Sequence, residues 1–116
     1  MINIRKEDEF LIVDLLVDRL DASIAPNFRN KIIEIINTGN TRIILNLTNV
    51  KFIDSSGLGS IVSGLKTLSE RGDLTLCCID QRIMSMFRLT RMDRVFKIFK
   101  TEGEAIDNLS SSTKAQ

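Results

Sequence analysis

Residues 42–79, RIILNLTNVKFIDSSGLGSIVSGLKTLSERGDLTLCCI, hold a strand pattern, a helix pattern and a second strand pattern in that order. The first, 42–48, is short, β-branched and almost continuously apolar, which is typical of a strand covered on both faces. The second, 74–79, is again an apolar run. Between them, five apolar residues follow helical spacing up to the glycine at Arg71-Gly72: Leu58, Ile61, Val62, Leu65 and Leu68. This arrangement predicts two parallel strands joined by a right-handed crossover.

The flanking sequence adds a hairpin and further helices. The apolar stretches 2–4 and 10–16 predict an N-terminal β-hairpin. A helical period over about 24–37 follows, where Ser23 can cap the first turn and Pro26 suits it. Downstream, a short helix, a last strand and a final helix are expected at 83–89, 95–99 and 102–109.

These elements make one α/β domain. Their order, β-β-α-β-α-β-α-β-α, predicts a mixed sheet of about five strands with about four α-helices. The chain of 116 residues is long enough for a single hydrophobic core. We expect the domain to occupy residues 1–109 and the small polar residues 110–116 to form a flexible tail.

The composition excludes several classes of function. The chain has a net charge of +1 and no histidine, tryptophan or tyrosine. Lack of histidine removes Ser-His triads and most zinc sites. The nearly neutral charge gives no electrostatic case for nucleic acid, and without Trp or Tyr there is little material for base stacking. No apolar run approaches the ~18 residues that span a bilayer, and the N-terminus has no secretory pattern. We therefore expect a cytoplasmic protein that uses no metal, cofactor, nucleic acid or membrane. We also expect a monomer, and the family resemblance described below implies that it is not an enzyme.

Two cysteines, Cys77 and Cys78, are adjacent in an apolar run. Neighbouring residues cannot form a disulfide without strain, so both are expected to be reduced packing residues. Charge is divided unevenly along the chain, because residues 7–21 sum to −5 and residues 82–100 to +5. Two interpretations stay open: solvated faces of a nearly neutral domain, or charge steering of a protein partner.

The central segment DSSGLG, residues 54–59, also has two interpretations. Asp54 and Ser55 precede an apolar helix, where short side-chain oxygens cap free backbone N–H groups, and capping alone would explain them. Alternatively, a phosphate on Ser55 would meet the positive end of the helix dipole. Gly57 and Gly59 each cost up to about 1 kcal/mol relative to alanine. If they admit a partner's backbone, changing either glycine to alanine should leave folding intact. The segment is neither a nucleotide P-loop nor a GxSxG elbow.

In its setting, DSSGLG carries a family resemblance. Together with RIILNLTNVKFI before it and IDQRIMSMFRLTRMDRVFKIF at 79–99, it resembles the STAS domain of anti-sigma factor antagonists over nearly the whole chain. The resemblance implies a phosphoacceptor at Ser55, with Ser56 as the alternative. It also implies a partner-binding surface at Asp21, Asp54, Ser56, Gly57, Leu58 and Gly59.

The resemblance further implies the partners. An unphosphorylated antagonist binds an anti-sigma factor that is also a serine protein kinase and frees its sigma factor. Phosphorylation abolishes this binding, and a PP2C-type phosphatase reverses it. The alternative is a constitutive docking or scaffold subunit without a phosphoswitch, for example in a lipid-transport complex. Nucleotide binding by the domain itself has no phosphate-cradling lysine motif in its favour.

The sequence departs from the family pattern at two places. Before Leu20-Asp21, where the family usually has glycine and an acid, this chain has Asp18 and Arg19. At Arg91, in LTRMD, the family commonly has a glycine in the turn before the last strand. Both changes are expected at surfaces that a partner could contact.

Overall fold

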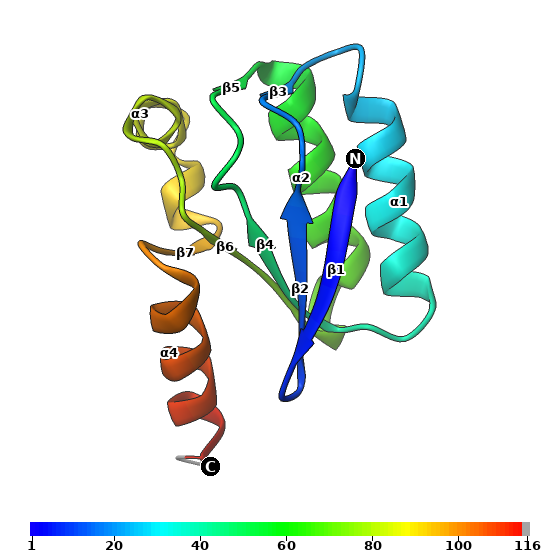
Figure 1. Ribbon diagram of the computed structural model, residues 1–116, viewed down its shortest axis with the longest axis vertical. Helices are drawn as coiled ribbons and strands as arrows, with labels where there is room; N and C mark the ends of the chain where they lie inside the picture. The colour runs from blue at the N-terminus through cyan, green and yellow to red at the C-terminus, as the bar shows by residue number, and fades with distance from the viewer. Residues whose placement is uncertain (115–116) are drawn as a thin grey trace.

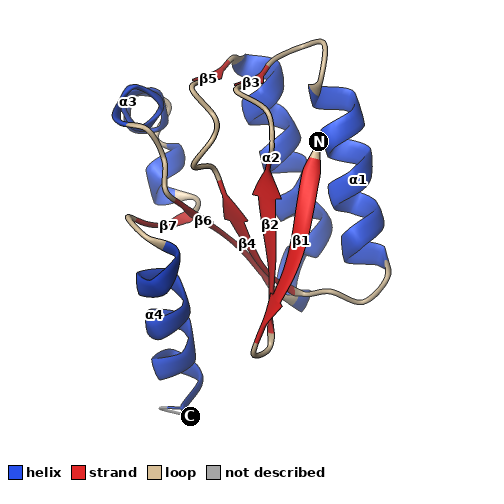
Figure 2. Ribbon diagram, in the orientation of Figure 1, coloured by secondary structure: helices blue, strands red, loops and turns tan. Residues whose placement is uncertain are grey.

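Five strands form a mixed sheet in the order β1-β2-β4-β6-β7 (Figure 2). The computed structural model describes residues 1–114, with side chains described through Ser110. The strands are β1 (Ile2–Glu7), β2 (Phe10–Leu15), β4 (Arg42–Asn46), β6 (Asp73–Cys77) and β7 (Lys97–Phe99). The helices are α1 (Ala25–Asn37), α2 (Ser55–Leu68), α3 (Gln81–Leu89) and α4 (Glu102–Lys114). β1 and β2 pair antiparallel and the other neighbours pair parallel, which confirms the predicted α/β domain and its crossover.

Both faces of the sheet are covered, α1 and α2 lying on one face and α4 on the other (Figure 1). Successive residues of a strand point to opposite faces. In β4, Ile43 and Leu45 join the large core under α1 and α2, whereas Ile44 joins the smaller cluster under α4. Burial on both faces explains why the sequence of this strand is an apolar run without alternation.

A second sheet of two short strands was not predicted from the sequence. β3 (Arg19–Leu20) and β5 (Phe52–Ile53) pair in parallel beyond the ends of β2 and β4 (Figure 1). Backbone hydrogen bonds at 2.7 Å and 3.2 Å run from Lys51 and Phe52 to the carbonyl oxygen of Asp18. This pairing brings the segment before α1 next to the start of α2.

Three predicted details at helix and strand ends are wrong. Ser23 does not cap α1, because its hydroxyl donates to Asp21 and the helix begins after Ile24 without a side-chain cap. The last strand begins at Lys97 rather than residue 95, because a 3₁₀ turn at Met92–Arg94 precedes it. The final helix continues to Lys114, past the predicted end at residue 109, and residues 115–116 of the expected tail lie outside the described residues.

Arg91 and the cysteines have clear local explanations. Arg91 has φ +61° and ψ +19°, a left-handed conformation that favours glycine, so the departure noted from the sequence falls on a strained backbone position. Cys77 and Cys78 are free thiols, as predicted, and both pack in the cluster under α4. Burial raises the pKa of the Cys77 thiol well above its ordinary value, so this group stays protonated.

Candidate functional site

Asp54 organises the start of α2. Its backbone is extended, with φ −99° and ψ −176°, and its side chain accepts a hydrogen bond from the Gly57 N–H at 2.9 Å. This is the N-cap geometry that the sequence predicted. The other carboxylate oxygen accepts from the Ala22 N–H at 3.1 Å. One side chain therefore caps α2 and also ties the loop before α1 to it.

Ser55 and Ser56 are the first two residues of α2, and both are exposed. The N–H groups of Gly57 and Leu58 are bonded to Asp54, through its carboxylate and its carbonyl oxygen. Within residues 1–114, the N–H groups of Ser55 and Ser56 have no hydrogen-bond acceptor in the protein. Ser55, the residue that the sequence singled out, therefore lies on the turn where two N–H groups are free and the helix dipole has its positive end.

Gly57 has a different role from the one expected. A Cβ at this position would overlap the carbonyl oxygen of Leu20 and would lie 2.9 Å from its carbonyl carbon. The glycine thus admits a backbone of the protein itself, that of β3. The expected tolerance of Gly57 to alanine is wrong for this reason. The contact could not be predicted from the sequence, because Leu20 is far from Gly57 along the chain.

The remaining residues of DSSGLG differ in accessibility. Gly59 is exposed, and a Cβ there would meet nothing within 4 Å. Leu58 is only 8% exposed and packs in the large core, so its side chain offers little surface to a partner. Ser56 and Gly59 line a shallow groove of about 510 Å³ between α1 and α2, together with Arg29 of α1.

Asp21 lies in the loop that Asp54 holds. Its carboxylate accepts hydrogen bonds from the Ser23 hydroxyl at 2.6 Å and the Ser23 N–H at 3.0 Å, and Arg19 lies 3.5 Å away. The Ser23 hydroxyl, and secondarily the Ser23 N–H and Arg19, hold the pKa of Asp21 below its ordinary value. The structure therefore brings Asp21 and Asp54 to one end of the sheet, connected through Ala22.

The Arg19–Phe52 pair is a feature of this surface that the sequence did not reveal. The Arg19 guanidinium carbon lies 4.2 Å from the centre of the Phe52 ring, a cation–π contact between the paired strands β3 and β5. Phe52 is 39% exposed, two residues before Asp54. Exposed aromatic and arginine side chains are typical anchors of protein interfaces. No periodic signal could have paired them, since each strand has only two residues.

The described residues contain neither a membrane-spanning helix nor a metal-binding cluster. No helix of residues 1–114 is both long and apolar enough to cross a membrane. No cluster of three or more His, Cys, Asp or Glu side chains suited to a metal ion occurs in that part of the chain. The exposed surface at the start of α2, around Ser55 and Ser56, is the candidate site.

The structure is thus a small α/β domain with an accessible serine at a capped helix start. The sequence matches the STAS domain over residues 1–105, and the chain belongs to that family. The anti-sigma-B factor antagonist of Listeria monocytogenes is 28% identical over 109 residues, which cover 92% of this chain and 95% of that protein.

Two solved structures are also similar. The protein TM1081 from Thermotoga maritima is 30% identical, with a TM-score of 0.83 and 92% of each chain covered. The phosphorylated form of SpoIIAA, a Bacillus cell fate determinant, is 26% identical, with a TM-score of 0.70 over 94% of this chain and 99% of that chain. The recognised family, α/β fold and mixed sheet agree with the sequence-based prediction.

Proposed function

We propose that this protein is an anti-sigma factor antagonist in a partner-switching pathway, and that phosphorylation of Ser55 controls it. The observation that carries the proposal is the exposed Ser55 hydroxyl on the first residue of α2, beside unsatisfied N–H groups. The name of the Listeria relative and the existence of a phosphorylated form of SpoIIAA support it.

The partner is an anti-sigma factor that is also a serine protein kinase. It binds the surface formed by Asp21, Ser55, Ser56 and Gly59, extended by Phe52, while Asp54 and Gly57 shape that surface from within. Phosphorylation adds about −1.5 to −2 charges to a contact made around a neutral hydroxyl, which weakens the complex. A PP2C-type phosphatase removes the phosphate. The chain is therefore a substrate of both enzymes and catalyses neither step.

The first test maps the modification. The protein is incubated with ATP and an anti-sigma-type serine kinase encoded beside its gene, and the phosphate is located by mass spectrometry. Phosphate is expected on Ser55, absent from Ser55→Ala and retained in the matched control Ser56→Ala. Phosphate only on the serines at 110–112 would contradict the proposal.

The second test measures binding. Ser55→Ala should bind the kinase as the unmodified protein does, and Ser55→Asp should bind about tenfold or more weakly, because a charge enters the contact. Neither change touches the core, since Ser55 is exposed, so the free energy of unfolding should not fall in Ser55→Asp and should rise by at most about 1 kcal/mol, because the carboxylate lies at the positive end of the helix dipole. Surface plasmon resonance gives the affinities and urea unfolding gives the stabilities. Equal affinity for wild type, Ser55→Asp and the phosphorylated protein would favour a constitutive docking subunit instead.

A further inference from the structure

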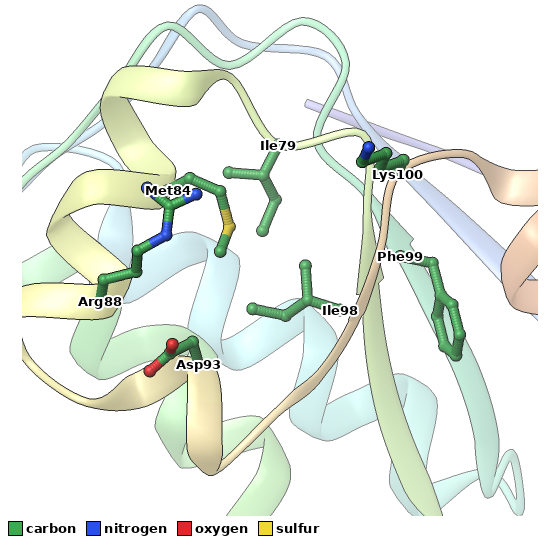
Figure 3. A pocket seen from close by; sticks show the side chains of 7 residues that line it. All are labelled: Ile79, Met84, Arg88, Asp93, Ile98, Phe99 and Lys100. Atoms are coloured by element: carbon green, nitrogen blue, oxygen red, sulfur yellow. The ribbon is translucent and has the colours of Figure 1, made fainter.

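A second hollow lies away from the start of α2, between α3 and β7 (Figure 3). Its volume is about 310 Å³. Its walls come from the segment after β6, from α3, from the 3₁₀ turn at Met92–Arg94 and from the end of β7. β6 and β7 are parallel, and the hollow lies outside their carboxyl ends.

The floor of the hollow is apolar. The side chains of Ile79, Met84 and Ile98 extend into the same space in Figure 3. Ile79 and Ile98 pack against the large core, and Met84 is half-buried. The ring of Phe99 points away from them and packs on the α4 side of the sheet. Met84 has a flexible, polarizable side chain that adapts to the shape of an apolar ligand.

The margin of the hollow is charged. Arg88 and Lys100 are exposed, and neither has an ion pair or a side-chain hydrogen bond among the described residues. Asp93 also lines the hollow, close to Arg88 in Figure 3 but without an ion pair to it. Two cations against one carboxylate leave a net charge of +1, which favours an anionic over a cationic ligand.

We infer that this hollow binds a small amphipathic anion, a carboxylate with an aliphatic chain. The chain lies on the floor of Ile79, Met84 and Ile98, and the carboxylate lies at the margin within reach of Arg88 and Lys100. At about 30 Å³ for each water-sized group, the 310 Å³ volume holds about ten non-hydrogen atoms, the size of octanoate. The inference is independent of the phosphoswitch, because no residue of DSSGLG lines the hollow.

Three ligands of equal chain length test the charge requirement: octanoate, 1-octanol and octylammonium. Binding is followed by NMR titration of the full-length protein. Octanoate should bind about tenfold more tightly than 1-octanol, because each exposed charge contact contributes up to about fivefold in affinity. Octylammonium should bind most weakly. Equal affinity for the acid and the alcohol, or tighter binding of the ammonium, would overturn the inference.

Variants then assign the two cations. Arg88→Gln combined with Lys100→Gln should lower the octanoate affinity about tenfold or more, to that of 1-octanol or below it because Asp93 remains, without a change in 1-octanol binding. Arg94→Gln is the matched control, because Arg94 is an exposed cation of the same region that does not line the hollow. An equal loss of octanoate affinity in Arg94→Gln would mean that octanoate responds only to the overall charge of this surface. It would overturn the assignment of the carboxylate contact to Arg88 and Lys100.

The methyl signals locate the ligand. Those of Ile79, Met84 and Ile98 should shift together on titration with octanoate and saturate with one dissociation constant. Leu89 is 86% exposed at the end of α3 and serves as a monitor of nonspecific adsorption. Shifts at Leu89 equal to those of the floor residues, without saturation, would show adsorption to the surface and no site.

Discussion

Gly57→Ala tests how the candidate site is built. The new methyl group would overlap the Leu20 carbonyl oxygen and lie 3.0 Å from the Leu20 side-chain Cγ, so β3 or α2 must shift. Overpacking of this kind costs about 1–3 kcal/mol. The change from glycine to alanine in a helix returns up to about 1 kcal/mol. We therefore expect a net loss of about 1–2 kcal/mol in the free energy of unfolding.

Gly59→Ala is the matched control in the same helix turn. Nothing lies within 4 Å of its added Cβ, so only the helix propensity changes, and stability should rise by up to about 1 kcal/mol. Urea unfolding followed by far-UV circular dichroism compares both variants with wild type. Gly57→Ala should have a lower urea midpoint than wild type, with an unchanged dependence of the unfolding free energy on urea concentration. A Gly57→Ala variant as stable as Gly59→Ala would refute the contact with Leu20 as the reason for this glycine.

Three further changes test other parts of the structure. Asp54→Ala should cost about 1–2 kcal/mol in urea unfolding, since both N–H groups bonded to the carboxylate lose their acceptor, and no loss would contradict the cap. Hydrogen bonds from Arg5 lower the pKa values of Asp14 and Glu102, so the two ionised carboxylates stabilise the folded protein above about pH 4.5. This stabilisation is lost as pH falls through the pKa values that the two groups have in the folded protein. In Glu102→Gln, the urea midpoint should fall less steeply with pH below pH 4.5 than in wild type. The same pH dependence in both proteins would exclude the Arg5–Glu102 ion pair as the cause of the fall. Arg91→Gly should stabilise the protein by about 0.5 kcal/mol in thermal unfolding, because φ +61° suits glycine, and an equal gain in Arg91→Ala would indicate charge relief instead.

The order of elements could be predicted from the sequence because each long element has its own local signal. The helical period over about 24–37 indicated α1, and the apolar residues Phe28, Ile32 and Ile36 on that period are buried. The apolar run at β4 indicated a strand covered on both faces, as observed. The Asp54 cap was also predictable, because acceptor and helix are neighbours along the chain.

The rest of the site depends on contacts between distant segments. β3 and β5 have two residues each, which is too short for any periodic pattern, yet their pairing creates the Arg19–Phe52 contact. Gly57 depends on the backbone of Leu20 in the same way. Local sequence could therefore locate the helix start but could not show which of its residues support the surface and which face a partner.

The Asp54 carboxylate accepts hydrogen bonds from the N–H groups of Ala22 and Gly57, so it has a structural role in this region. Other residues of the same surface have no such role. Replacing Asp54 would remove both hydrogen bonds and destabilise the start of α2. Arg19 and Phe52 are exposed and support no such cap. A cell with several proteins of this fold must keep each signal with its own partner, and specificity is a difference of affinities. Exposed positions such as Arg19 and Phe52 can therefore change the choice of partner without disturbing the Asp54 cap that sets the geometry of Ser55.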